Sequence, residues 1–177
     1  MVTITRHKMM LHYTGLFDFD GLYALIIDWA KNYGYIWYEI DYKHKVPSPR
    51  GAEQEFKWLM HKEVTEMVSF DIRFEVHIWD LVELEVEVGG KKKTLTSGKI
   101  YIWMFPDITF DWQKKFTGST FRRKLFDVYY KKVAKKRLDN VYAEQILYRM
   151  YDLQALIKQF FDLQSKRHAY KDYLKES

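Results

Sequence analysis

The sequence predicts an α+β protein in which an antiparallel β-sheet of five to six strands carries one N-terminal helix and two C-terminal helices packed on it. Three successive patterns support this fold class. Apolar residues recur three or four apart over about 18–32, at every second position over 35–112, and three or four apart again over 119–164. The helical segments therefore flank a continuous block of strands.

Composition predicts a soluble protein with its own core. The chain has 177 residues, of which 18% are aromatic and 30% charged, and it has no cysteine. These values favour one folded domain, over 1–165, followed by a charged tail over 166–177. Thiol chemistry and disulfides are excluded, and no cofactor is expected. Because no apolar run reaches the length of a membrane span or signal core, we expect a cytoplasmic protein without a transmembrane segment.

The first elements are predicted to be a strand over 3–14 and a helix over 18–32. Asp18 can cap the amino end of this helix, because its short side chain accepts a hydrogen bond from the first turn. Gly34 suits the left-handed conformation that commonly follows a helix.

The alternating block contains a hairpin whose turn is Gly89-Gly90. A two-residue turn at a double glycine favours antiparallel pairing of the strands on either side. The register expected from it pairs Glu87 with Lys92, Glu85 with Thr94, Val76 with Trp103, and Ile78 with Tyr101.

Asp80 interrupts the apolar alternation of the first hairpin strand. The same register places the neighbouring Leu81 opposite Gly98, which offers no side chain to pack. We therefore expect a β-bulge or bend here that turns Asp80 outward.

Two helices are expected at the C-terminal side, over 119–137 and 139–164. The second has a broad apolar stripe that should cover the sheet. The stripe consists of Leu138, Tyr142, Ile146, Met150, Leu153, Ile157 and Phe160.

The order of these elements resembles the helix-grip architecture of START-type ligand-binding domains, in which long curved strands are closed by a C-terminal helix. The resemblance is one of element order alone, and one of the two early helices usual there is missing. The segments 17–23 (FDFDGLY) and 77–81 (HIWDL) are similar to uncharacterised archaeal proteins. Neither resemblance implies an activity.

Titratable residues offer a possible polar site near His61, His77 and Asp80. The common phosphate-loop, hydrolase and zinc-protease motifs are absent from the sequence. The two histidines share the parity of Glu55, Glu63 and Glu75 on neighbouring strands, so the group could bind a metal or transfer protons. The simpler explanation is a solvated sheet face with ordinary polar residues, and we favour it because no pair has tight ligand spacing.

The segment 119–137 is strongly basic, with eight basic residues against one acidic residue. Arg123, Lys124, Lys131 and Lys135 could contact nucleic-acid phosphates or an anionic membrane. A solvated helix face would explain the same pattern.

The strand over 99–105 is apolar on both sides, which a sheet with helices on one face does not require. Ile100, Ile102 and Met104 alternate with Tyr101, Trp103 and Phe105. The expected register places Trp37 and Trp79 on the same face as Ile100 and Ile102. The second apolar face is covered by a remaining helix, lines a ligand cavity, or forms an interface.

These observations predict a non-enzymatic binding or assembly module. Its partner would be a hydrophobic ligand, another protein or a second copy, held on an aromatic sheet face. The residues assigned to that face are Trp37, Trp79, Tyr101, Trp103 and Phe105. RNA or DNA binding by helix 119–137 is one alternative, and an enzyme with a polar site near His61, His77 and Asp80 is another.

Overall fold

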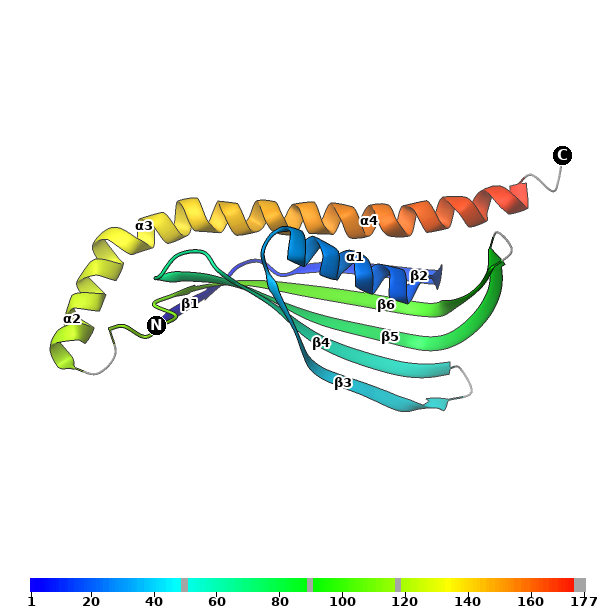
Figure 1. The fold of residues 1–177 in the computed structure, drawn as a ribbon, viewed down its shortest axis with the longest axis horizontal. Coiled ribbons are helices and arrows are strands. Elements are labelled where there is room, and N and C mark those ends of the chain that lie inside the picture. The colour runs from blue at the N-terminus through cyan, green and yellow to red at the C-terminus, as the bar shows by residue number, and fades with distance from the viewer. Residues whose placement is uncertain (49–50, 89–90, 117–118, 174–177) are drawn as a thin grey trace.

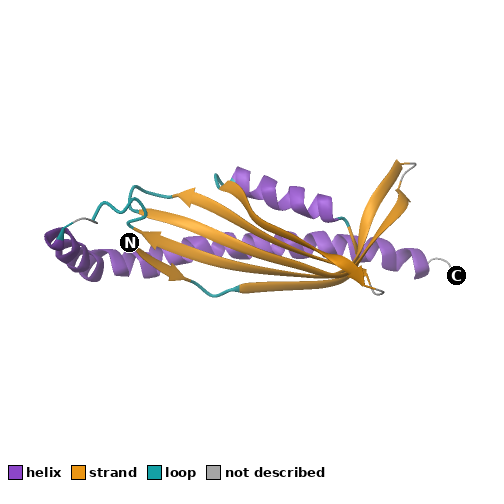
Figure 2. Ribbon diagram, turned by 90° about the horizontal axis from the view of Figure 1, so that it is seen from below, coloured by secondary structure: helices purple, strands orange, loops and turns teal. Residues whose placement is uncertain are grey.

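The computed structural model describes residues 1–48, 51–88, 91–116 and 119–173, and shows one antiparallel sheet with helices along it (Figures 1 and 2). The sheet has the order β1-β6-β5-β4-β3, and β2 also pairs with β6. The strands are β1 (Val2–Thr5), β2 (Met9–Phe17), β3 (Ile36–Ser48), β4 (Gly51–Glu63), β5 (Val68–Val88) and β6 (Lys91–Phe110). The predicted α+β class and antiparallel sheet are confirmed. The single N-terminal strand expected over 3–14 is instead two strands, which pair with successive parts of β6.

Helix α1 (Phe19–Asn32) follows the expected local signals. The Asp18 carboxylate accepts a hydrogen bond from the Gly21 N–H at 3.0 Å, which caps the helix. Gly34 has a φ of +73°, in the left-handed region that favours glycine. Leu22 and Ile26 are buried on the side that faces the sheet and α4.

The C-terminal region is one continuous helical stretch, so the prediction of two separate helices is wrong. It comprises α2 (Thr120–Tyr129), a π-helical turn (Tyr130–Ala134), α3 (Lys135–Arg137), a second π-helical turn (Leu138–Tyr142) and α4 (Ala143–Tyr173). The segment 119–164 has no glycine or proline to end a helix. The π turns accommodate a bend instead, which Figure 1 shows near α3. Helix α4 also extends past the expected end at 164.

Helices α1 and α4 lie on the same face of the sheet (Figure 1). We call this the inner face. Its strand residues are almost completely buried: Ile72, Phe74, Val76, Ile78, Ile100, Ile102 and Met104. Ile146, Met150, Leu153 and Ile157 of α4 are buried as well. The Trp29 indole N–H donates a 3.0 Å hydrogen bond to Asp152, which joins α1 to α4.

The hairpin register is confirmed close to its turn. Gly89 and Gly90 lie outside the described residues. On either side of them, Val88 pairs with Lys91, Glu87 with Lys92, and Glu85 with Thr94. Further from the turn a bulge between Trp79 and Val82 shifts the register by one residue. Val76 and Ile78 therefore pair with Ile102 and Ile100, and the expected pairing with Trp103 and Tyr101 is wrong.

The bulge is accommodated by glycines on both neighbouring strands. Asp80 has a φ of +54°. A Cβ on Gly98 would lie 2.8 Å from the Trp79 carbonyl oxygen, and one on Gly51 would lie 2.7 Å from the Asp80 carbonyl carbon. Beyond this point the hairpin leaves the plane of the sheet (Figure 2).

Within the described residues, no helix is both long and apolar enough to cross a membrane.

Candidate functional site

The outer face of the sheet, opposite α1 and α4, carries a cluster of half-buried aromatic side chains. We call Trp79, Tyr101, Trp103 and Phe105 the aromatic face. The bulge reverses the parity of β5, so Trp79 lies beside Tyr101 and not on the inner face with Ile100, where the uninterrupted register had placed it. Trp37 does lie on the inner face, where its ring contacts Trp58 and Phe74. The five assigned residues are therefore divided between the two faces.

Ring contacts join three strands across the aromatic face. Tyr101 lies 4.2 Å from His12 of β2 and 4.8 Å from Trp79 of β5, measured between ring centroids. Along β6, Tyr101 stacks on Trp103 at 5.7 Å. The Arg73 guanidinium lies 5.5 Å above the Phe105 ring. The rings of His12, Trp79, Tyr101 and Trp103 are thus connected across the middle of the sheet.

Charged side chains of both signs surround the rings. Lys99 pairs with Asp80 at 2.7 Å, and Arg73 pairs with Asp107 at 2.8 Å. Asp80 is therefore turned outward into an ion pair. The sequence predicted a bulge that turns Asp80 outward, and Asp80 does face outward, paired with the exposed Lys99.

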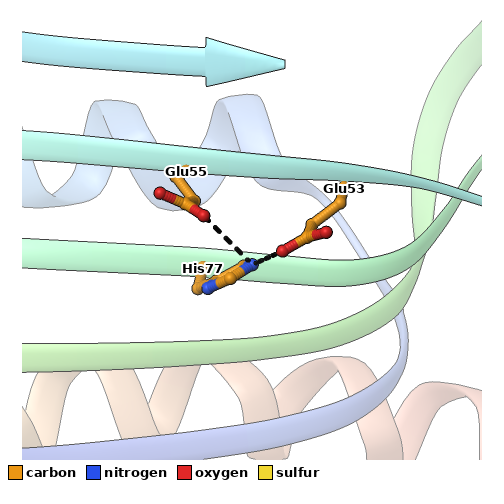
Figure 3. Close-up of side chains that lie close together, drawn as sticks. All are labelled: Glu53, Glu55 and His77. Atoms are coloured by element: carbon orange, nitrogen blue, oxygen red, sulfur yellow. Dashed lines mark hydrogen bonds and ion pairs between the residues drawn. The ribbon is translucent and has the colours of Figure 1, made fainter. Parts of the chain in front are cut away.

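A second group on the outer face consists of Glu53, Glu55 and His77 (Figure 3). One ligand atom from each lies within 4.8 Å of the others. His77 Nε2 is hydrogen-bonded to Glu53 and lies 3.8 Å from Glu55. Two carboxylates and an imidazole are ligand types that zinc accepts. The sequence reasoning included Glu55 and His77 but missed Glu53, whose odd parity in the same strand was the available signal.

Lys45 already pairs with both carboxylates of this group. Its ammonium lies 2.7 Å from Glu53 and 2.8 Å from Glu55. The hydrogen bonds from Lys45 hold the pKa of both carboxyl groups below their ordinary value, and those to Glu53 and then Glu55 raise the pKa of Lys45. The group is thus an ion-pair network in which a metal would have to displace Lys45.

His61 does not join His77. It pairs with Asp71 at 2.6 Å, and its ring contacts Trp112 edge-on. The strand register places it six residues along β4 from Glu55, which lies opposite His77. The predicted polar site is therefore three separate pairings and not a single cluster.

Arg123, Lys124, Lys131 and Lys135 are exposed on the helical stretch that bends away from the line of α4 (Figure 1) and packs Phe126 against Phe110 at the end of β6. Three apolar side chains of α2 are exposed there too: Phe121, Leu125 and Val128. This surface is amphipathic, which differs from the purely basic surface expected for phosphate contacts.

A pocket that the sequence did not predict lies between the amino end of α1, the edge strand β3 and its neighbour β4. It has a volume of about 540 Å³. Its lining consists of Phe19, Asp20, Tyr23, Glu39, Ile40, Asp41, Tyr42, Phe56 and Trp58. Phe19 and Tyr23 are four apart in α1 and so share one side of the helix, and this spacing was the available signal.

No protein family model matches the chain, and a search among curated proteins finds no match.

Proposed function

We propose that this protein is a non-enzymatic assembly module that associates with a second copy of itself through the aromatic face. The observation that supports this proposal is the position of Trp79, Tyr101, Trp103 and Phe105. The rings of Trp79, Tyr101 and Trp103 contact one another on the side of the sheet opposite both α1 and α4, and Phe105 follows two residues further along β6.

The residue types of this surface are those of protein interfaces. Aromatic residues, methionine and arginine are enriched at interface centres, and polar groups form the rim. Here Met10 of β2, which is 55% exposed, pairs with Trp103, and Arg73 lies over Phe105. The pockets beside α1, between β1 and α4, and beside α2 are all lined by other residues. A protein partner therefore fits it better than a small apolar ligand.

Charge favours a second copy as that partner. The rim has Arg73 and Lys99 beside Glu75, Asp80 and Glu53 on the same face. A two-fold contact brings a surface against itself, so a rim with both signs can pair its own charges without net repulsion. Nucleic acid would require a predominantly basic surface.

Light scattering during size-exclusion chromatography tests the proposal. We expect the wild type to be a dimer at micromolar concentration, and Trp103→Asp to be a folded monomer. Tyr148→Asp, which changes an aromatic side chain of α4 that is 71% exposed, should remain a dimer. Trp103→Thr separates loss of association from loss of folding, because threonine is favoured in strands and should keep the sheet intact. Circular dichroism measures its folding, and light scattering measures its association.

A wild type that is monomeric, or a Trp103→Thr variant that still dimerises, would overturn the proposal. A monomer that binds generic RNA at low salt, and loses that binding on Lys124→Glu, Lys131→Glu and Lys135→Glu, would replace it with the nucleic-acid alternative.

A further inference from the structure

We propose that the pocket between α1 and the β3–β4 edge binds an organic ammonium cation, such as a quaternary ammonium group or a methylated lysine side chain. This inference concerns the inner side of the sheet and is independent of self-association. It depends on two properties of the pocket lining, which are its aromatic rings and its charge.

Five aromatic side chains line the pocket and contact one another. Phe19 stacks on Phe56 at 5.0 Å, and Phe56 lies 4.9 Å from Tyr42 and 5.6 Å from Trp58. Tyr23 meets Trp58 edge-on at 5.4 Å. Trp58 forms the floor of the pocket and is held in the core, since it is only 3% exposed. Tyr42 lies at the rim and is 56% exposed. Proteins recognise quaternary ammonium groups with several aromatic rings around one pocket, through the negative faces of the rings, and five rings line this pocket.

The charged residues of the lining are all acidic: Asp20, Glu39 and Asp41. The amino end of α1 would by itself disfavour a cation, because its free N–H groups carry partial positive charge. Asp18 caps that end and is paired with Lys93, and Asp20 in the first turn adds a carboxylate to the pocket lining. Glu39 accepts a hydrogen bond from the Tyr23 hydroxyl, which orients one ring of the pocket. Lys43 pairs with Asp41 at 3.5 Å and is 54% exposed, so it offsets only one of the three charges.

The same lining is unsuited to other ligands. A bare metal ion needs several ligand atoms close together, and among the described residues the acidic and histidine groups that converge in this way are Glu53, Glu55 and His77 on the outer face. A neutral apolar ligand would remove water from the carboxylates without replacing the lost hydration. Anions would be repelled. A large, weakly hydrated cation satisfies both the rings and the carboxylates.

The edge strand provides an opening to this pocket. The pairing of β3 with β4 is interrupted between Glu39 and Asp41, which leaves Ile40 60% exposed beside the pocket. A ligand can therefore enter from solvent without separating α1 from the sheet.

Titration calorimetry with choline tests the proposal, with 3,3-dimethyl-1-butanol as the neutral probe of the same shape. We expect saturable choline binding in the millimolar range or tighter, and at least tenfold weaker binding of the neutral alcohol. Quenching of tryptophan fluorescence gives a second readout, because Trp58 lines the pocket.

Two variants locate the site. Tyr42→Ala removes an exposed ring and should weaken choline binding about threefold to tenfold, the range expected for one cation–π contact. Asp20→Asn removes one charge and should weaken it several-fold, whereas Asp28→Asn, on the same helix but outside the pocket, should leave it unchanged. Equal affinity for the two probes, absence of choline binding at millimolar concentration, or equal effects of Asp20→Asn and Asp28→Asn would overturn the proposal.

Discussion

The two faces of strand β6 carry similar amounts of apolar side chain but differ in how far these side chains are buried. Ile100, Ile102 and Met104 are at most 1% exposed beneath α1 and α4, whereas Tyr101 and Trp103 between them are half-buried on the open side. Alternation alone places both sets, because successive side chains of a strand point to opposite faces. The helices determine which set becomes the core. Apolar character in a strand therefore identifies surfaces that need covering, but not what covers them.

The largest expected effect comes from placing a charge on each face in turn. Ile102→Lys should unfold the protein, because an unpaired charge in the core costs at least several kcal/mol, which is a large part of the stability of a small domain. Trp103→Lys should stay folded, since its side chain already reaches solvent. Urea unfolding followed by circular dichroism measures both, and equal loss of stability would show that the outer face is also core.

A smaller loss of stability is expected at the bulge that assigns Trp79 to the outer face. Gly98→Val would place a Cβ 2.8 Å from the Trp79 carbonyl oxygen, so the strands must separate. The cost should be about 3 kcal/mol, the upper range for overpacking. Thr94→Val, at an exposed position of the same strand, is the control and should change thermal stability little. A wild-type melting temperature for Gly98→Val would contradict the role assigned to this glycine.

The smallest expected effect concerns Tyr35, just before β3, and Tyr38, near the start of that strand. Burial raises the pKa of Tyr35 to about 12, whereas Tyr38 on the outer face is 44% exposed. A tyrosine whose folded pKa is raised holds its proton more tightly in the folded state. Its stabilising contribution is therefore fully present below pH 10 and is lost as the pH rises towards 12.

The loss should reach about 2 kcal/mol for the wild type, at up to ~1.4 kcal/mol per pH unit. Tyr35→Phe should remove this part of the alkaline decline in unfolding free energy, while Tyr38→Phe should leave it in place. Identical alkaline profiles for wild type and Tyr35→Phe would show that Tyr35 ionises normally.

Local signals predicted local structure well. Asp18 caps α1, Gly34 follows it with a positive φ, and the residues beside the hairpin turn pair as expected. Each depends on neighbours within a few positions, whose geometry the residue types themselves determine. The register failed only beyond the bulge, because one extra residue in β5 exchanges the two faces for every residue further along the strand.

The candidate sites were predictable only in part for the same reason. Strand parity was enough to place Glu55 and His77 near each other. The ion pairs of Lys45 with Glu53 and Glu55 could not be predicted, because they form only when β3 lies beside β4. The aromatic pocket forms because α1 packs over β3 and β4. No local sequence pattern predicts this packing.

By itself, the sequence determined the α+β class, the helix cap, the hairpin and the two-sided apolar strand, since each follows from periodicity or from the conformational preferences of single residues. The tertiary structure alone decided that α1 and α4 share one face, that Trp79 lies on the other, and that the C-terminal helices form one bent stretch. These features depend on long-range packing and on small local changes in register and helical pitch. Their energies are sums over many distant contacts, so residue order along the chain does not reveal them.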